Sequence, residues 1–441
     1  MTELKKIAVI GCWHQGVVGA ACLASLGYDV LGADADGARV EKLNRGQAPL
    51  FEPGLDDLLK KETGAGRLRF TTDMAGAVKD RDYVLVMFDT PVDENDRSDL
   101  SGVFAAVQAI APNLRQEVVV YVTAQLPVGT CDQLRDLIRK TNPSLKFGLA
   151  YSPENLRLGQ AIDRFLHPAL PVIGAEEPET LDRVEQLFSP LNVKWHRVNL
   201  RTAEMTKHAL NAFLATSVTF ANELGNLCDE VGADGSRLAE VLRLEPRVGP
   251  KAMLLPGLGF SGGTLARDMQ TLRELGDRFQ FDTKLLDGVW MSNRQQNQLV
   301  IRKLKKSLGE LAGRRVAVLG LTYKPDTSTL RRSASLEIIG DMVREQMAVT
   351  AHDPKADRGE LAQHSEFKFF ENVYDAVQDA EAVVLITGWA EYKTLDYAQI
   401  KSLMKGTVLI DTQNMLNGDR MMALGFRYLD IGRGRVAGGS T

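Results

Sequence analysis

The chain has 441 residues, which is too long for one hydrophobic core and indicates two or three domains. Hydrophobic residues make up 44% and charged residues 25% of the chain, so a globular protein is expected. Because the formal net charge is −4, neither nucleic acid nor an anionic membrane is predicted as a partner. The segment "MTELKKIAVIG" enters a strand pattern without an apolar signal core, and no run of about 18 apolar residues occurs elsewhere, so a cytoplasmic location is expected.

The first part of the chain alternates short β-rich runs with more polar segments that suit helices. This alternation is typical of parallel βαβ units, so it predicts an N-terminal α/β domain over residues 1–200. The predicted strands are 6–11, 29–34, 83–88, 117–123 and 170–174.

The opening segment "IAVIGCWHQGVVGAACLASLGYDVLGADAD", residues 7–36, has the order strand, tight glycine turn, helix and strand. In a G-x-G-x-x-G turn the first glycine makes the bend, the second admits the pyrophosphate, and the third lets the helix pack on the strand. Gly11 and Gly16 occupy the first and third positions, but Trp13 occupies the second. Asp34 ends the second strand, where its carboxylate can accept hydrogen bonds from the adenosine ribose and disfavour a 2′-phosphate. A dinucleotide-binding Rossmann unit is therefore predicted, in which the indole of Trp13 turns away from the phosphates, occupies their space or fills an emptied cofactor site.

The strand pattern stops between about 200 and 300. Residues 202–233 have helical periodicity over an unusual length, which favours a helix that links domains or packs against a partner subunit. A central helical domain over 201–300 is predicted, and a homodimer built on this helix is expected.

The strand pattern restarts at "RRVAVLGL", residues 314–321, which echoes "KKIAVIG" near the N-terminus. The echo predicts a second α/β domain over 310–441. The expected fold class is therefore α/β, with two Rossmann-like parallel-sheet domains joined by a helical central dimerisation domain. Further predicted strands are 349–353, 381–387 and 406–411.

Ordered motifs along nearly the whole chain resemble those of the UDP-glucose/GDP-mannose 6-dehydrogenase family. The resemblance implies an N-terminal NAD-binding domain, a central dimerisation domain and a C-terminal nucleotide-sugar domain. It also implies oxidation of the C6 alcohol of a nucleotide sugar to a carboxylate with two NAD, through a thiohemiacetal and a thioester on one cysteine. After the opening turn, the matching segments are "LNRGQAPLFEPGLDDLL" (43–59), "DTPVDENDRSDLSGV" (89–103), "QLPVGT" (125–130), "SPENLRLGQAIDRFLHP" (152–168), "AEMTKHALNAFLA" (203–215), "EPRVGP" (245–250), "GLGFSGGTLARD" (257–268) and "LGLTYKPDTSTLRRSASLEI" (319–338).

The nucleophile is the clearest departure from the family. Its cysteine lies in a segment like G-F-G-G-S-C-F-P-K-D, which falls on "GFSGGTLARD", so Thr264 stands in its place and no cysteine lies nearby. A thiolate is strongly nucleophilic near neutral pH, whereas a hydroxyl needs an adjacent base. The chain's four cysteines have no CxxC spacing and its six histidines show no ligand spacing, so neither a disulfide framework nor a metal site is predicted.

Three functions remain open on these observations. The first is an NAD-using nucleotide-sugar oxidoreductase that is limited to alcohol-to-aldehyde oxidation, because Thr264 suits thioester chemistry poorly. The second is a catalytically inactive relative that binds a nucleotide sugar or a partner dehydrogenase. The third is a different reaction on the inherited scaffold.

The resemblance also indicates an altered cofactor cleft, and NAD is the cofactor that it implies. Asp89, followed by Thr90, replaces the glycine of the family's G-T-P loop, and Gln125 replaces the threonine of its T-V-P-V-G-T loop. Both loops line the NAD cleft in the family, so the ability of this chain to bind NAD is an open question. The candidate cofactor residues are Gly11, Trp13, Gly16, Asp34, Asp89, Thr90 and Gln125.

The candidate catalytic residues match the family's polar centre. Lys207 and Asn211 are four residues apart, so they share a helix face and can direct an ammonium and an amide at one oxygen. Asp268 matches the aspartate that positions or deprotonates a water, although the simpler alternative is a cap for the helix that begins near "MQTLREL". With Thr264 and Glu154, which matches a glutamate at the junction of cofactor and substrate, these residues complete the catalytic set.

The resemblance implies substrate contacts from several segments. Arg247 matches an arginine that reaches the sugar of a neighbouring subunit, and Lys324 and Arg331 match cationic positions at the nucleotide end. Leu158 and Gln413 replace a glutamate and a basic residue of the family. The candidate substrate residues are Leu156, Arg157, Lys207, Asn211, Arg247, Phe260, Gly262, Lys324 and Arg331.

Overall fold

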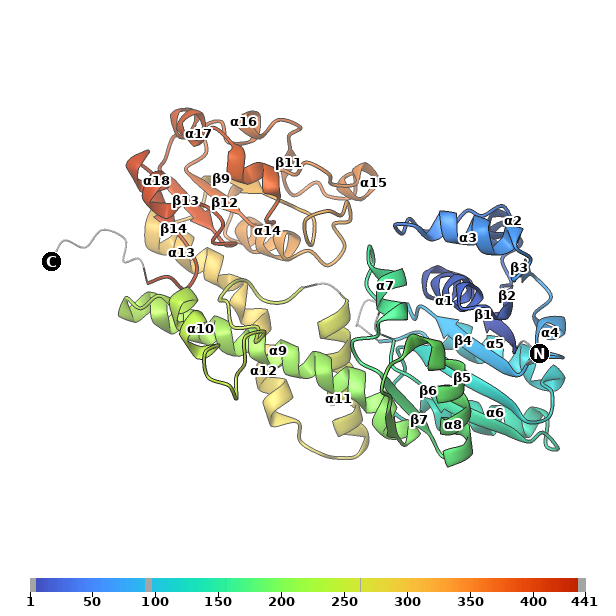
Figure 1. Cartoon of the computed structure of the whole chain (residues 1–441). Helices are drawn as coiled ribbons and strands as arrows, with labels where there is room; N and C mark the ends of the chain where they lie inside the picture. Colours follow the sequence, from blue (N-terminus) through green and yellow to red (C-terminus); the bar gives the residue numbers. More distant parts are fainter. Residues whose placement is uncertain (1–4, 92–96, 155, 262, 435–441) are drawn as a thin grey trace. The chain divides into compact units, whose positions relative to one another are not determined.

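The computed structural model describes residues 5–91, 97–154, 156–261 and 263–434, so the candidate substrate residue Gly262 lies outside the described residues. The chain divides into two compact units (Figure 1). The first unit is Met1–Leu210 and the second is Asn211–Thr441.

The first unit is built on an eight-stranded sheet with the order β3-β2-β1-β4-β5-β6-β7-β8. Successive residues of β1 enter opposite hydrophobic clusters, Ile7 and Val9 on one face and Ala8 and Ile10 on the other, because side chains alternate along a strand and both faces are covered. The strands are β1 (Lys6–Ile10), β2 (Asp29–Ala33), β3 (Leu68–Thr71), β4 (Tyr83–Phe88), β5 (Val118–Ala124), β6 (Phe147–Tyr151), β7 (Val172–Ala175) and β8 (His196–Val198).

One pairing departs from the predicted parallel sheet, because β7 runs antiparallel to β6. A parallel connection needs a crossover that spans the sheet, usually a helix. Between these strands the chain forms one short helix, α7 (Ala161–Leu166), and enters β7 in the direction opposite to β6.

Helices cover both faces of this sheet. On the face with Ile7 and Val9 lie α1 (His14–Ser25), α2 (Gly37–Asn44), α3 (Leu55–Gly64), α7 and α8 (Pro178–Leu187). On the other face lie α4 (Met74–Ala77), α5 (Ser101–Ile110) and α6 (Thr130–Thr141). Short 3-10 turns occur at Ala111–Asn113 and Ser189–Leu191.

A 32-residue helix, α9 (Leu200–Val231), covers the predicted long helix to within two residues at each end. In the second unit its side chains Ala212 and Ala215 pack with α11 and α12 in a small hydrophobic cluster. The other helices of this region are α10 (Gly235–Leu242), α11 (Thr264–Arg278), α12 (Lys284–Gln296) and α13 (Gln298–Leu308).

The second unit also carries a parallel six-stranded sheet with the order β11-β10-β9-β12-β13-β14. The strands are β9 (Arg315–Leu319), β10 (Ala348–His352), β11 (Lys368–Phe369), β12 (Ala382–Leu385), β13 (Val408–Asp411) and β14 (Arg427–Leu429). The helices around it are α14 (Ala334–Arg344), α15 (Arg358–Leu361), α16 (Val373–Ala376), α17 (Tyr397–Leu403) and α18 (Gly418–Ala423), with a 3-10 turn at Ala390–Thr394. Two parallel-sheet α/β regions with a helical region between them in sequence are therefore confirmed.

The similarity between the two sheets extends to the turns that follow β1 and β9. Gly11 follows β1 with φ +91°, and Gly320 follows β9 with φ +95°. After each glycine, a backbone amide donates to a buried carboxylate that follows the neighbouring strand: Cys12 N to Asp34 at 2.7 Å, and Leu321 N to Asp353 at 2.7 Å.

Within the described residues, no helix is long and apolar enough to cross a membrane. The same part of the chain contains no group of three or more histidine, cysteine or acidic side chains placed to hold a metal ion.

Candidate functional site

The opening turn has the geometry that its glycines predict. A Cβ atom on Gly11 would lie 2.7 Å from the carbonyl oxygen of Met87, and one on Gly16 would lie 1.7 Å from that of Gly11. Both positions therefore require glycine. Trp13 immediately precedes α1 and is 43% exposed, so the indole lies outside the core instead of filling it.

Arg39 on α2 joins Trp13 to Asp34. Its Nη1 donates to both carboxylate oxygens of Asp34 at 2.8 and 2.9 Å, and its guanidinium carbon lies 5.0 Å from the centroid of the Trp13 ring. Arg39 was not predicted from the sequence, although its position in the first turn of the helix after Asp34 could have indicated a contact with that residue. Because the guanidinium neutralises the negative charge of Asp34, this carboxylate repels a 2′-phosphate less than the sequence suggests.

Asp89 reaches the N-terminus of α1. Its Oδ2 accepts a hydrogen bond from the backbone amide of Gln15 at 3.2 Å. The helix has no acidic residue in its first turn and no side-chain cap of its own. Amides at a helix N-terminus attract anions, and a dinucleotide places its diphosphate there. Asp89 thus brings a negative charge to the position that a diphosphate would need.

The loops after β4 and β5 meet at the same edge of the sheet. Thr90 Oγ1 donates to the carbonyl oxygen of Gln125 at 3.2 Å, and the Gln125 side chain is buried.

Glu204 on α9 fixes the start of α6, because its carboxylate accepts hydrogen bonds from Gly129 N at 2.6 Å and from Cys131 N at 2.7 Å. Sequence reasoning did not assign Glu204 a role.

A cavity of about 70 Å³ lies beside the SPEN segment in the first unit. Glu154 and Leu156 line it, and the Glu154 carboxylate also accepts a hydrogen bond from Leu156 N, whereas Arg157 is exposed. Three buried polar atoms of lining residues have no hydrogen-bond partner in the described part of the chain: Gln15 Oε1, Arg164 Nε and Trp195 Nε1. The walls of the cavity therefore contain an unsatisfied acceptor and two unsatisfied donors.

In the second unit, Asn211 and Asp268 form a buried pair. Asn211 Nδ2 donates to Asp268 Oδ2, and Asp268 is fully buried on α11. The alternative that Asp268 caps a helix is wrong, because α11 begins at Thr264 with Gly263 as its N-cap. Lys207 lies one turn before Asn211 on α9, within the first unit, and is also buried.

Thr264 is the first residue of α11 and is exposed. All four cysteines of the chain are buried, and burial raises the pKa of each thiol above its usual value. A buried thiol with a raised pKa supplies little thiolate near neutral pH.

The glycine-rich loop before α11 is held by side-chain amides that sequence reasoning missed. Asn293 makes two hydrogen bonds with the backbone of Phe260, at 2.7 and 3.1 Å. Asn297 accepts from Gly259 N at 3.1 Å, and Asn222 accepts from Gly257 N at 2.8 Å. Asn293 on α12 and Asn297, which lies between α12 and α13, are four residues apart, and this spacing was the available signal for them.

The cationic candidates Lys324, Arg331 and Arg247 are all exposed. Lys324 is exposed, with its ammonium 5.4 Å from the Tyr323 ring centroid, and Arg331 is also exposed. The neighbouring Arg332 is half-buried with φ +59°, and its Nη1 lies 3.2 Å from where a Cβ atom on Gly263 would be. Arg247 bonds only locally among the described residues, to Glu245.

Three models of one family match the chain. The UDP-glucose/GDP-mannose dehydrogenase family is matched by its NAD binding domain over residues 5–192, its central domain over 201–295 and its UDP binding domain over 317–418.

Full-length relatives agree with these matches. The chain is 33% identical to the UDP-glucose 6-dehydrogenase TuaD of Bacillus subtilis (strain 168) over 99% of this chain and 95% of that protein. It is 35% identical to the UDP-glucose 6-dehydrogenase of Rhizobium meliloti (strain 1021) over 97% of this chain and 99% of that protein.

A solved structure of a UDP-glucose dehydrogenase from Pyrobaculum islandicum superposes with a TM-score of 0.82 at 29% identity, covering 94% of this chain and 95% of that one. A UDP-D-ManNAc dehydrogenase from Pyrococcus horikoshii also gives 0.82, at 26% identity, over 98% of this chain and all of that one. The family expected from the motifs is therefore confirmed: the chain belongs to the UDP-glucose/GDP-mannose dehydrogenase family.

Proposed function

We propose that this chain is a nucleotide-sugar 6-dehydrogenase-like oxidoreductase that acts on a UDP- or GDP-sugar with NAD and carries oxidation no further than the aldehyde. The observation that carries the proposal is the buried Asn211–Asp268 pair, which is present on a chain whose α11 begins with Thr264 instead of cysteine. Asn211 and Asp268 thus match the polar centre expected from the family resemblance, whereas Thr264 stands where that resemblance places a cysteine nucleophile.

The roles of the chain's own residues follow from their chemistry. The Asn211 amide fixes one oxygen of Asp268, so the carboxylate is oriented to hold a water or a substrate hydroxyl. Lys207 shares a face of α9 with Asn211, and a lysine ammonium stabilises negative charge that develops on a substrate oxygen. The Thr264 hydroxyl can hydrogen-bond an aldehyde but has no base assigned to activate it.

The residues at the opening turn fit part of a dinucleotide. Gly11 and Gly16 have no side chain, so the start of α1 can pack closely against the turn after β1. Asp34 offers a hydrogen-bond acceptor, and Arg39 a donor, to the adenosine half of a dinucleotide. Asp89 does not fit, because its carboxylate already holds the helix amide of Gln15. We infer that NAD binds weakly to this chain.

Asp89 also favours a second candidate function. If its carboxylate excludes the diphosphate altogether, the chain is a catalytically inactive relative that binds a nucleotide sugar or a partner dehydrogenase. Calorimetric titration of the protein with NAD separates the candidates: measurable binding favours the oxidoreductase, and none up to millimolar concentration favours the inactive relative.

We expect a nucleotide sugar to bind in the second unit, near Asn211, Phe260 and Lys324. A panel of UDP-, GDP- and dTDP-sugars at millimolar concentration should raise the melting temperature with at least one member, because ligand binding to the native state stabilises it. Lys324→Met should weaken that effect by removing a cation from the nucleotide end, whereas Lys405→Met, just before β13 at the opposite end of the sheet, should not. A panel that leaves the melting temperature unchanged would contradict the proposal.

A homodimer remains our expectation, and α9 offers the surface for it. Phe213, Phe220 and Leu227 are spaced by seven residues and are 69%, 50% and 61% exposed, and Val231 is 76% exposed. Apolar residues at this spacing form a stripe along a helix and are typical of a helix-to-helix contact between subunits.

Phe220→Glu should convert the protein to a monomer at micromolar concentration, because it places a charge in the centre of that stripe. Light scattering measures the mass, and Met422→Glu, at an exposed apolar residue of α18, is the matched control that should stay dimeric. A wild-type protein with the mass of one chain would refute the dimer.

A further inference from the structure

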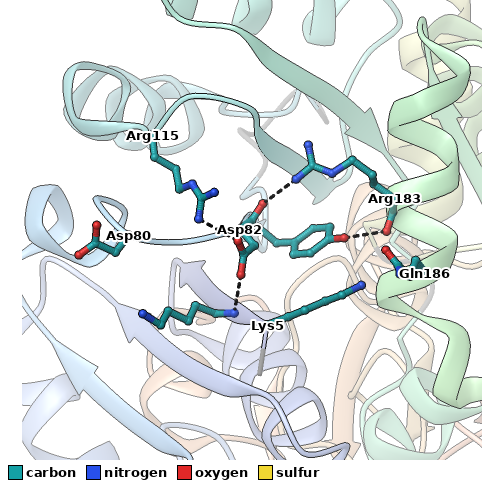
Figure 2. Close-up of a pocket in the computed structure, with 8 residues that line it drawn as sticks. Lys5, Asp80, Asp82, Arg115, Arg183 and Gln186 are labelled. Carbon is teal, nitrogen blue, oxygen red and sulfur yellow. Dashed lines mark hydrogen bonds and ion pairs between the residues drawn. The ribbon is translucent and has the colours of Figure 1, made fainter. Parts of the chain in front are cut away.

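A polar cavity of about 630 Å³ opens at the edge of the first sheet where β1 and β4 begin (Figure 2). Gly11 and Asp89 follow the opposite ends of the same two strands. The cavity is therefore separate from the candidate cofactor turn. Its lining residues are Lys5, Lys6, Asp80, Asp82, Tyr83, Arg115, Arg183 and Gln186.

The lining carries four cationic side chains and two carboxylates. Asp82 lies among the cations in Figure 2, and its carboxylate accepts from Arg115 Nη1 at 2.8 Å and from the backbone amide of Lys6 at 2.9 Å. Arg183 donates only to backbone carbonyl oxygens among the described residues, those of Asp82 and Glu117. Asp82 thus leaves part of the positive charge unmatched.

The ammonium group of Lys5 is the least satisfied of these cations. It is shielded from solvent and has no hydrogen-bond partner in the part of the chain that the structure describes. Burial lowers the pKa of Lys5, the Arg183 guanidinium adds to this effect, and only Asp82 opposes it. A shielded ammonium without a partner is costly, and an anion in the cavity that Lys5 lines would offset that cost.

Tyr83 decides what kind of anion fits. Lys5 Nζ lies 5.5 Å and Arg183 Cζ 5.6 Å from the centroid of its ring, and the side chain is 2% exposed. The cavity therefore has no open aromatic face on which a nucleotide base could stack. Lysine and arginine groups are the donors that phosphate oxygens prefer, and the volume has room for more than one phosphoryl group.

We propose that this cavity binds a compact phosphate-class anion, inorganic phosphate or pyrophosphate, through Lys5, Lys6 and Arg115. The proposal does not depend on the proposed oxidoreductase function, because none of these residues belongs to the candidate cofactor or substrate site.

Calorimetric titration of the full chain with inorganic phosphate and with pyrophosphate, each at constant ionic strength set by chloride, tests the proposal. Saturable binding of at least one of them is expected, and the tighter of the two identifies the size of the anion. Lys5→Met should weaken binding about fivefold, because one full charge close to the anion is removed. Asp80→Asn should strengthen it by a similar factor, since this exposed carboxylate lines the cavity and repels the anion.

The control is Lys42→Met, which removes one exposed positive charge from α2 and should leave the affinity unchanged. Binding that neither Lys5→Met nor Asp80→Asn alters would place the anion elsewhere and overturn the proposal. So would the absence of saturable binding for both anions. Asp80→Asn tests the charge at the protein surface, so it decides the question even where Lys5→Met does not fold.

Discussion

Thr264→Cys alone is expected to form little carboxylate from any nucleotide sugar at NAD concentrations well below the weakened dissociation constant of this chain. The substitution restores a thiol at the start of α11, but Asp89 and Trp13 still stand at the opening turn. A carboxylate on the helix amide that a diphosphate needs, beside an indole in place of the second glycine, should weaken dinucleotide binding by about 2–3 kcal/mol, or on the order of a hundredfold. The nicotinamide must be in place before a covalent step can matter.

The triple variant Trp13→Gly, Asp89→Gly and Thr264→Cys is expected to bind NAD more tightly than the wild type and to form carboxylate, which Thr264→Cys alone forms only slowly. Calorimetry with NAD on the wild type, the single variant and the triple variant gives the binding, and absorbance of NADH with a panel of UDP-sugars gives the activity. The matched control is Trp13→Gly with Asp89→Gly and Thr264 unchanged, which should bind NAD without forming carboxylate. Tight binding of NAD by the wild type would contradict the obstruction and favour the oxidoreductase over the inactive relative.

Glu204→Ala is expected to lower the free energy of unfolding by about 3 kcal/mol. The carboxylate is fully buried and accepts from Gly129 N and Cys131 N, so its removal leaves two amide donors at the start of α6 without a partner. Each buried donor left unsatisfied costs about 1–3 kcal/mol. Urea denaturation measures the change, and Glu204→Gln, which keeps one acceptor oxygen, should lose less. Equal stability of the alanine variant and the wild type would contradict this role.

The same residue predicts a pH dependence. Burial raises the pKa of Glu204 above its usual 4.5, although the amides of Gly129 and Cys131 oppose the shift. As pH rises from 4.5 through the raised pKa, the unfolded chain releases its proton while the folded chain retains it, so the stability supplied by the protonated carboxyl is lost. The unfolding free energy of the wild type should therefore fall relative to that of Glu204→Gln over this pH range. A difference between the two that stays constant across the range would refute the assignment.

The sequence by itself determined the two sheets, the long helix and the family. In "KIAVI" and "RVAVL" four apolar residues follow one charged residue, because both faces of a parallel strand are buried, so these runs mark β1 and β9 without any tertiary information. The periodicity of 202–233 identified α9, since one face of a helix repeats every three to four residues. The tight turn at Gly11 and Gly16 could be predicted from the sequence, because its backbone leaves no room for a Cβ atom at either position.

Only the tertiary structure decided which distant groups meet. Asp89 lies 74 residues from the Gln15 amide that it accepts from, and Glu204 lies more than 70 residues from the amides at the start of α6. The antiparallel pairing of β7 with β6 is likewise decided only in the tertiary structure, because a strand pattern does not report the direction of the neighbouring strand. Periodicity reports whether a residue is buried, but it does not report its partner. The partner is fixed by the packing of elements far apart in sequence, and in this protein those partners decide whether the opening turn is free for a diphosphate.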